Sequence, residues 1–274
     1  MEDAYPVITS AANPAVKHVV RLRDRRDRER EQLTVLEGYR ELTRGREYGL
    51  TITEAFFAPE WFLGENEMPL LATLAAEGAR VVRVAPHLLE KMAYRERPEG
   101  LIAIARMRRH TLADIPLFPD GFYLVAESVE KPGNLGSMLR SADAAGVDGM
   151  ILCDKNTDIY NPNVIRASTG ALFSVPLAES TSQEAFDFLK SHQIPMLAAT
   201  PHAEKIYTEV DMTGPVAIVV GTEQYGLTEL WMKHADLPVR IPMLGKIDSL
   251  NVATATTILL YEAARQRNWR QRKG

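Results

Sequence analysis

The chain has 274 residues, a net charge of −4 and a hydrophobic fraction of 46%, values that indicate a globular protein with room for two domains. No apolar run approaches the roughly 18 residues that span a bilayer, and the first ten residues lack the apolar core of a secretory signal, so we expect a cytoplasmic protein without membrane contact. The slight excess of acids excludes a protein that coats nucleic acid through bulk charge, so any RNA contact must use local basic patches.

The first 110 residues predict a small α/β domain. Asn13 and Pro14 predict a helix start, because asparagine caps helices and proline fits their first position. We expect this helix to continue through residues 21–31. The six arginines and four acids there fit either a solvated face with i,i+4 ion pairs or an RNA-facing patch that includes Arg21 and Arg23. Alternating short elements follow, with strands expected at 33–38, 52–57, 81–85 and 100–107 and helices at 39–49, 70–78 and 86–94.

A linker is expected at residues 111–120, where two prolines interrupt a stretch without periodicity. It separates a first domain at 1–110 from a second domain at 121–274. The second domain again alternates, with strands expected at 122–127, 149–153, 196–199, 216–220 and 237–241 and helices at 134–145, 161–168, 183–192, 227–235 and 249–267.

The strands expected at 149–153 and 216–220 are apolar throughout, as strands covered on both faces must be. This pattern predicts a mostly parallel sheet with helices on both faces. The fold class expected for the whole chain is therefore α/β in both domains.

The cysteine and histidine content predicts neither a disulfide nor a metal site. The single cysteine, Cys153, ends an apolar strand and fits a buried, inert thiol of a reducing compartment. The six histidines show no paired spacing of the kind that zinc sites use.

Three polar segments that contain glycine follow predicted strands of the second domain. They are NLGSMLRSA at 134–142, GTEQYGL at 221–227 and RIPMLGKIDSLNVATATTILLYE at 240–262. Ligands of open parallel sheets bind beyond the carboxyl ends of the strands, so we expect the three segments to converge.

In the first segment, Leu135, Leu139 and Ala142 follow the helical repeat and form the expected buried stripe. Arg140 lies off that stripe, so it either points across the strand ends or forms a surface ion pair. Asn134 stands where it caps the helix or reaches a ligand.

The second and third segments offer five further positions. Gly221 permits a close approach of backbone or ligand, and Gly226 eases a turn. Glu223 between them fits a carboxylate at a helix start or a polar contact in the site. Ser249 is placed to cap the last helix, which does not exclude a ligand role, and Asn251 in the first turn is free for polar contacts.

Together, these segments resemble the three signature motifs of the SPOUT-clan (SpoU-type) RNA ribose 2′-O-methyltransferases. The resemblance covers residues 120 to about 265 and includes RASTGALFSVPL at 166–177. The first domain, with LEGYRELTRG at 36–45, is similar to the ribosomal-protein-like substrate-binding domain often fused ahead of the catalytic one. Lys131 stands where the family often has an acid, a difference that bears on substrate preference.

The resemblance implies a methyl transfer from S-adenosylmethionine to a ribose 2′-hydroxyl of structured RNA, with ribosomal RNA favoured over transfer RNA. It implies a cofactor held in a trefoil knot, an exception to the rule that chains avoid knots, and a homodimer. The implied catalytic set is Arg140, Asn134, Glu223, Ser249 and Asn251. The implied cofactor contacts are Thr200, Gly221, Ile241, Met243 and Leu250. The expected RNA contacts are Arg140, Arg166, Arg21 and Arg23, and no metal is expected.

Two alternatives remain at this point. One alternative is a catalytically silent RNA-binding protein with the same fold. Such a protein does not need the three polar segments, so their presence in intact form argues against this alternative. A nicotinamide-dependent oxidoreductase requires a G-x-G-x-x-G fingerprint that the chain lacks. Trp231 and Tyr261 fit either a dimer interface or core packing.

Overall fold

The computed structural model describes residues 5–222 and 224–270 and divides into two compact units. The first unit comprises Met1–Arg109 and Tyr160–Phe173, and the second comprises His110–Ile159 and Ser174–Gly274. The bounds expected from the sequence, 1–110 and 121–274, assign residues 160–173 to the second domain, whereas in the structure this segment belongs to the first unit.

Specific contacts hold residues 160–173 in the first unit. The hydroxyl of Tyr160 accepts a hydrogen bond of 2.8 Å from the amide of Arg108. Helix α7 (Pro162–Ser168) packs against strand β2 (Leu33–Glu37), and the guanidinium of Arg44 donates to the carbonyl of Thr169 at 2.7 Å. These partners lie far apart in the sequence, so no local pattern predicts their pairing.

The first unit is built on a five-stranded mixed sheet with the order β1-β4-β3-β5-β2. Strands β1 and β3 run parallel to β4, whereas β5 runs antiparallel to both β3 and β2. The strands other than β2 are β1 (Val7–Ile8), β3 (Ile52–Phe57), β4 (Arg80–Val84) and β5 (Leu101–Arg106).

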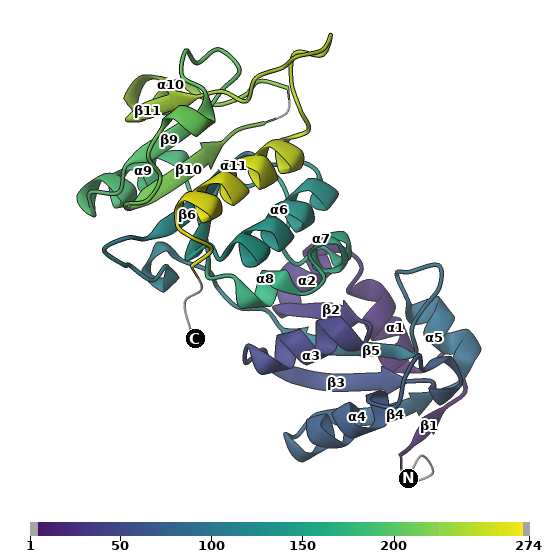
Figure 1. Ribbon diagram of the computed structural model, residues 1–274. Helices are drawn as coiled ribbons and strands as arrows, with labels where there is room; N and C mark the ends of the chain where they lie inside the picture. Colours follow the sequence, from purple (N-terminus) through teal and green to yellow (C-terminus); the bar gives the residue numbers. More distant parts are fainter. Residues whose placement is uncertain (1–4, 223, 271–274) are drawn as a thin grey trace. The chain divides into compact units, whose positions relative to one another are not determined.

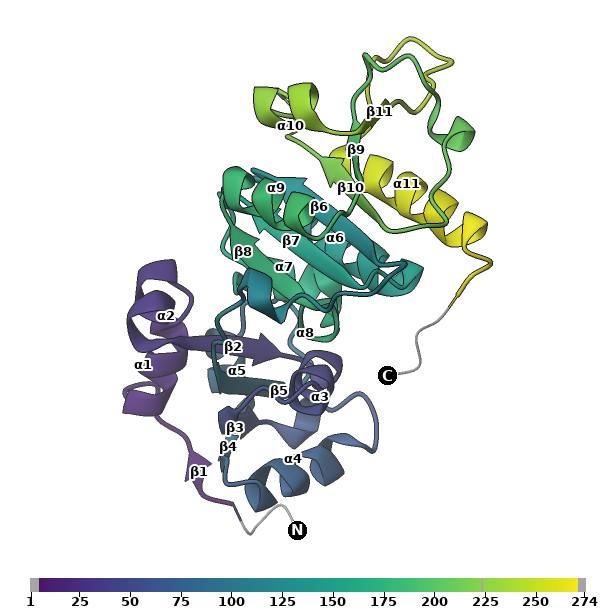
Figure 2. The ribbon, with the colours of Figure 1, turned by 90° about the vertical axis from the view of Figure 1, so that its left-hand side faces the viewer.

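Helices cover both faces of this sheet (Figure 2). Helices α1 (Pro14–Arg21) and α5 (Pro86–Met92) share one core with the sheet through buried residues such as Val19 and Leu88. The remaining helices are α2 (Arg25–Glu31), α3 (Tyr39–Glu47) and α4 (Glu67–Ala76), with a short 3-10 turn at Pro59–Trp61.

The prediction of one helix through residues 21–31 is wrong, because α1 ends at Arg21 and a separate helix, α2, follows. The carboxylate of Asp24 caps α2 by accepting from the amide of Arg26 at 2.8 Å. Arg28 is 1% exposed and donates to the carbonyls of Leu22 and Arg23 at 2.9 and 2.6 Å. These bonds stabilise the turn between the two helices. A charge pattern alone does not reveal that one of six arginines is buried for this purpose.

The second unit is built on a six-stranded sheet with the order β11-β9-β10-β6-β7-β8, in which every neighbouring pair is parallel. Its strands are β6 (Phe122–Glu127), β7 (Gly149–Cys153), β8 (Leu177–Ser180), β9 (Met196–Ala199), β10 (Val216–Val220) and β11 (Leu237–Val239). The predicted parallel sheet is confirmed, and four of its strands have the predicted bounds. Strand β8 was not predicted, and β11 ends two residues early.

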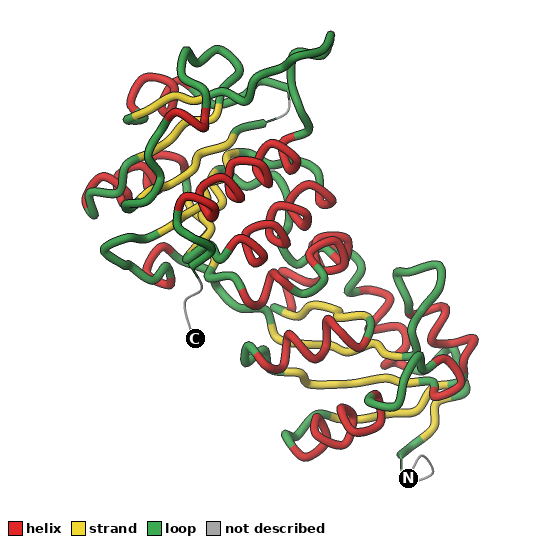
Figure 3. Tube along the Cα trace, viewed as in Figure 1, coloured by secondary structure: helices red, strands yellow, loops and turns green. Residues whose placement is uncertain are grey.

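Helices α6 (Pro132–Ala145) and α11 (Val252–Gln266) lie side by side on one face of this sheet, and α9 (Ser182–Ser191) and α10 (Glu229–His234) cover the other (Figures 1 and 2). Figure 3 shows the alternation of strands and helices along the chain. The helix α8 (Ala171–Ser174) and 3-10 turns at Leu112–Asp114 and Tyr207–Glu209 complete the elements. Cys153 is buried and unpaired, as expected.

Within the described residues, no helix combines the length and apolarity needed to cross a membrane.

Candidate active site

The three polar segments start at the carboxyl ends of strands in the parallel sheet. Strand β6 pairs with β10 in the middle of the sheet, with Ala126 opposite Val220, so their carboxyl ends are adjacent. From β6 the chain proceeds to β7 and β8 on one side and then returns to β9 and β10 on the other. This reversal of strand order is the place where open parallel sheets bind ligands.

The first and third segments meet through two asparagines. The Nδ2 of Asn251 donates to the Oδ1 of Asn134 at 3.1 Å. Farther along the same helices, the hydroxyls of Ser141 and Thr257 form a hydrogen bond of 2.7 Å. Helices α6 and α11 therefore run parallel (Figure 1), and their amino termini lie together beyond the end of β6. Both helix dipoles thus favour negative charge at this point.

The structure corrects the predicted helix caps. Helix α11 begins at Val252, and its cap is Asn251, whose Oδ1 accepts from the amides of Ala253 and Thr254 at 3.0 and 3.4 Å. Ser249 is not the cap and lies exposed in the preceding loop. Because α6 already begins at Pro132, Asn134 lies in its first turn and does not cap it.

Arg140 lies on the side of α6 that faces away from the core. Leu135, Leu139 and Ala142 are 1%, 0% and 0% exposed, which confirms the predicted buried stripe. The Arg140 side chain is exposed, and it has no hydrogen bond or ion pair with any other residue in the described part of the chain. The alternative of a surface ion pair therefore finds no partner among those residues.

The segment after β10 folds back on itself. Thr222 and Gly226 exchange backbone hydrogen bonds of 3.0 and 3.1 Å, and Gly226 has a φ of +68°. A Cβ at Gly221 would lie 2.2 Å from the carbonyl oxygen of Gly226. Both glycine predictions are confirmed, and the group that approaches Gly221 is backbone. Glu223 lies outside the described residues.

Glu127, at the end of β6, is a residue that the sequence analysis missed. Glu127 is 1% exposed, and its carboxylate accepts hydrogen bonds from the hydroxyl of Ser182 at 2.8 Å, the amide and hydroxyl of Thr228 at 2.8 and 2.7 Å, and the indole of Trp231 at 3.0 Å. Thr228 directly follows the 221–227 segment, so Glu127 fixes the end of that segment. An acid that ends an otherwise apolar strand was the available signal.

The five expected cofactor positions follow β9, β10 and β11, which are neighbours in the sheet. Thr200 and Gly221 are buried, and Ile241, Met243 and Leu250 are half-buried. The amide of Thr200 donates to the carbonyl of Val239 at 2.9 Å, which joins the ends of β9 and β11. None of the five carries a charge, so this set of backbone groups, one hydroxyl and apolar side chains suits an adenosine that bears its own positive sulfonium.

The expected RNA contacts other than Arg140 lie in the first unit. Arg21 and Arg166 are exposed. Arg23 instead donates to the carbonyls of Lys91 and Ala93, which ties the start of α2 to the end of α5. Both bonds come from Nη2 of Arg23, so this nitrogen is engaged within the protein.

No group of three or more histidines, cysteines and acids that could hold a metal ion exists among residues 5–222 and 224–270.

The buried Trp231 packs edge-on against Phe186 at a ring distance of 6.1 Å in the core of the second unit. Of the two readings left open for Trp231, core packing is the correct one. Tyr261 is 42% exposed and lies beside Trp269 at a ring distance of 6.2 Å.

Comparison with known proteins gives concordant results for both parts of the chain. Residues 121–261 match the model of the SpoU rRNA methylase family, and residues 13–103 match that of the MRM3-like substrate binding domain. A 23S rRNA (uridine(2479)-2′-O)-methyltransferase of Streptomyces viridochromogenes is 32% identical over 252 residues, which cover 89% of this chain and 86% of the relative.

Solved structures agree with these matches. A crystal structure of an RNA 2′-O ribose methyltransferase is 42% identical, with a TM-score of 0.85 and coverage of 96% of this chain and 99% of that one. The SpoU methyltransferase AviRb from Streptomyces viridochromogenes, in complex with the cofactor AdoMet, is 30% identical with a TM-score of 0.83, covering 93% and 98% of the two chains.

Proposed function

Because the chain belongs to the SpoU rRNA methylase family, we propose that it transfers the methyl group of S-adenosylmethionine to a ribose 2′-hydroxyl of ribosomal RNA. The chain is an S-adenosylmethionine-dependent RNA 2′-O-methyltransferase, and ribosomal RNA is the substrate of relatives that share both of its domains. The observation that supports the assignment of the site most strongly is the hydrogen bond between Asn134 and Asn251, since it joins the first and third motifs at the end of the central strand.

The cofactor would be held by Thr200, Gly221, Ile241, Met243 and Leu250. When bound, it supplies a methyl group on a positive sulfonium, so the protein has to align the acceptor hydroxyl and accommodate the loss of its proton. The uncharged lining avoids placing a second cation beside the sulfonium, which would be unfavourable in a partly desolvated site.

Arg140 acts on the acceptor ribose. A guanidinium has no acceptor lone pair, so Arg140 does not serve as a general base. It instead holds a phosphate next to the acceptor and stabilises the negative charge that develops on the ribose oxygen. Alignment of the reacting groups lowers the activation barrier by as much as ~7–11 kcal/mol. General-base assistance raises the rate by ~10²–10⁴, which corresponds to a smaller reduction of the barrier. Alignment is therefore the larger effect.

The polar residues around Arg140 complete the site. Asn251 uses its oxygen to cap α11 and its amide nitrogen to bind Asn134, so the orientation of both amides is fixed before RNA binds. Ser249 and Asn251 position the ribose, and Glu223 orients Arg140 or Asn134.

The first unit binds the RNA fragment around the target nucleotide, with Arg166 and Arg21 as contacts. A second copy of the chain completes the active site, as a homodimer in the cytoplasm. The exposed pair of Tyr261 and Trp269 on and after α11 is a candidate part of that interface. Cofactor-binding loops of the carboxyl-terminal part are threaded as a trefoil knot.

A thermal shift distinguishes this function from a silent RNA-binding protein. S-adenosylmethionine at ~100 times its dissociation constant stabilises a binding protein by about 2.7 kcal/mol, so a clear rise in melting temperature is expected. The same preparation should transfer tritium from methyl-labelled S-adenosylmethionine to unmodified ribosomal RNA. A chain that shows neither the shift nor the transfer would be the silent binder.

A further inference from the structure

We propose that a pocket of the first unit binds one unstacked nucleotide of the RNA substrate, an inference that rests on the proposed function. The pocket has a volume of about 490 Å³ and is formed by the start of α3, the loop before α4, the segment after α5 and the end of α7. We call it the arginine pocket, and its defining residues are Tyr39, Arg40, Asn66, Arg95, Glu99 and Arg166.

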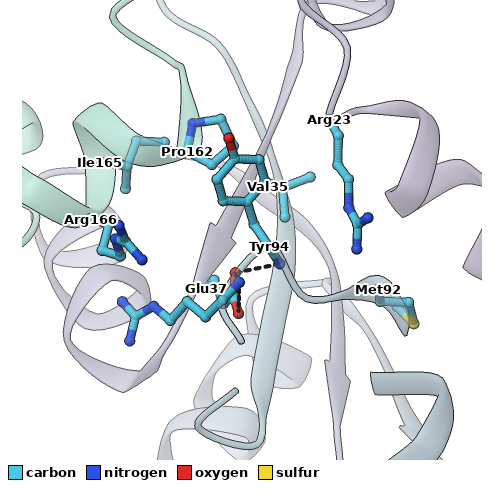
Figure 4. Close-up of a pocket in the computed structure, with 9 residues that line it drawn as sticks. Arg23, Val35, Glu37, Met92, Tyr94, Pro162, Ile165 and Arg166 are labelled. Carbon is cyan, nitrogen blue, oxygen red and sulfur yellow. Dashed lines mark hydrogen bonds between the residues drawn. The ribbon is translucent and has the colours of Figure 1, made fainter. Parts of the chain in front are cut away.

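A smaller hollow continues the arginine pocket, because Arg95 and Arg166 line both. Figure 4 shows the lining of this hollow, in which the carboxylate of Glu37 accepts from the amide of Tyr94 at 2.9 Å. Burial raises the pKa of the Glu37 carboxyl, and backbone amides oppose that shift. The side chain of Glu37 is thus part of the wall rather than a group available to a ligand.

The charged groups of the arginine pocket divide into engaged and available ones. Arg95 pairs with Glu41 at 2.7 Å and also with Glu99, and Glu67 accepts from the amides of Leu63 and Gly64 at 3.1 and 3.0 Å. Arg40 and Arg166 are exposed, and their side chains have no hydrogen bond or ion pair with any other described residue. The charged donors left for a ligand therefore belong to these two guanidiniums.

These donors favour a phosphodiester. A guanidinium presents a planar fork of N–H groups that matches phosphate oxygens. Three arginines and three glutamates line the pocket, so its wall is electrically balanced overall. Such a wall does not attract the several phosphate groups of a pyrophosphate or triphosphate, but it accepts a unit with one phosphate group.

The remaining lining suits a base. Tyr39 is half-buried in the wall, and tyrosine rings stack on unpaired bases with little sequence preference. The side chain of Glu99 is 34% exposed and retains acceptor capacity for the amino group of a base. The volume falls within the ~300–1,000 Å³ of small-molecule sites, so one nucleotide with its phosphate fits the pocket in size and chemistry.

The pocket is preorganised because α7 is fixed to the rest of the unit. The bond from Arg44 to the carbonyl of Thr169 holds the end of α7, and the Nδ2 of Asn163 donates to the hydroxyl of Tyr94 at 3.1 Å. Gly170 follows with a φ of +85°, and a Cβ there would lie 2.9 Å from the Cδ of Arg44. Arg166 is therefore presented by a helix that needs no ordering when RNA binds.

The test compares four full-length variants with the wild-type enzyme: Tyr39→Ala, Tyr39→Phe, the double change of Arg40→Gln and Arg166→Gln, and a control, Arg80→Gln. Arg80 lies in the same unit, is exposed and pairs with the carboxylate of Glu54 at 3.2 Å, so the control removes a positive charge outside the pocket. Affinity for a fluorescent single-stranded RNA heptamer is measured at several salt concentrations, alongside affinity for S-adenosylmethionine.

The double variant is expected to bind the heptamer at least tenfold more weakly, with a salt slope reduced by about 0.7, because the pocket holds one phosphate and each single-strand phosphate contact contributes ≈ 0.7. Tyr39→Ala is expected to lose about tenfold, and Tyr39→Phe should restore binding because the ring is kept. The Arg80→Gln control and the affinity for S-adenosylmethionine should stay within twofold of wild type. Uridine monophosphate should displace the heptamer, and pyrophosphate at the same concentration should not.

Two outcomes would refute the proposal that the arginine pocket binds a nucleotide. One is a double variant that binds the heptamer like wild type, and the other is displacement by pyrophosphate as effective as by uridine monophosphate. If the wild-type enzyme still methylates ribosomal RNA in that case, the proposed function stands and only the pocket is lost. A wild-type enzyme that neither binds S-adenosylmethionine nor methylates RNA would instead refute the proposed function.

Discussion

The two sheets of this protein position their candidate sites in different ways. In the second unit every strand pair is parallel, so all carboxyl ends meet at one edge, and the polar segments after β6, β10 and β11 gather there. In the first unit β5 runs against its neighbours, so the strand ends point both ways. Its candidate RNA contacts come from α3 and α7 instead. Topology therefore positions the candidate active site, whereas the distribution of unpaired arginines determines the expected RNA surface.

The largest expected effect comes from the arginine that the parallel sheet presents. Arg140→Ala should reduce methyl transfer by about 10²–10³, the cost of removing one group that stabilises developing negative charge. Affinity for S-adenosylmethionine should be unchanged, because Arg140 is not among the expected cofactor contacts. Radiolabelled methyl transfer and calorimetry measure the two quantities, and Arg265→Ala is a matched control on α11, where Arg265 pairs with Glu262 at 2.8 Å. Cofactor affinity that falls in step with activity would refute this division of roles.

The next effect concerns the carboxylate that holds the 221–227 segment in place. Glu127→Ala leaves the buried Ser182 and Trp231, and also Thr228, without their acceptor, which should lower the free energy of unfolding by about 3 kcal/mol. Affinity for S-adenosylmethionine should also fall, because Gly221 and Thr228 lie at the two ends of the same turn. Chemical denaturation and calorimetry measure these effects.

Glu127→Gln tests the same network without a cavity, because it keeps the shape and one acceptor oxygen. It should recover part of the stability and part of the cofactor affinity. Full cofactor affinity in a destabilised Glu127→Ala enzyme would mean that Glu127 serves the core alone.

A smaller effect separates the two uses of Asn251. Asn251→Asp keeps an oxygen that caps α11 and removes the amide that binds Asn134. Stability should therefore change by less than ~0.5 kcal/mol, while methyl transfer should fall at least tenfold. Asn251→Ala removes both, and should cost about 1 kcal/mol of stability in addition. If Asn251→Asp keeps full activity, the contact between the two asparagines has no part in catalysis.

The smallest effect concerns the thiol of Cys153. Burial raises its pKa to about 12 from an ordinary value of 9.0. The folded chain thus holds this proton when the unfolded chain has lost it, so the contribution of the thiol to stability is present below about pH 9 and declines as the pH rises toward about 12. Alkylation at about pH 8 should occur only after unfolding, since the thiolate is the reactive form. The decline of stability above about pH 9 should be less steep in Cys153→Ala. Rapid alkylation of the folded enzyme would contradict the burial.

The sequence predicted the parallel sheet well because its buried strands are short apolar runs between turn residues. Strand β8 was not predicted because Leu177–Ser180 contains only two apolar residues and shows neither an alternation of apolar and polar residues nor an apolar run. The convergence of the three polar segments was expected from strand direction alone, and the bond between Asn134 and Asn251 confirms it for the first and third segments.

What the sequence did not predict depends on choices between local alternatives or on distant partners. Ser249 and Asn251 are both good capping residues, and only the path of the loop decides that Asn251 takes this role. In the sequence, Arg28 cannot be distinguished from its charged neighbours. Its role depends on the end of α1 at Arg21, because the turn that follows contains the backbone carbonyls to which Arg28 donates. The placement of residues 160–173 in the first unit depends on Arg44 and Arg108, more than 50 residues earlier in the chain.

The central claim is that this chain methylates ribose 2′-hydroxyls of ribosomal RNA. Mapping of ribose methylation in total RNA from cells with and without the intact chain tests it most directly. We predict that one or a few positions of ribosomal RNA lose their 2′-O-methyl group in its absence, and regain it with the wild-type chain but not with Arg140→Ala. Identical methylation maps in the presence and absence of the chain would contradict the account.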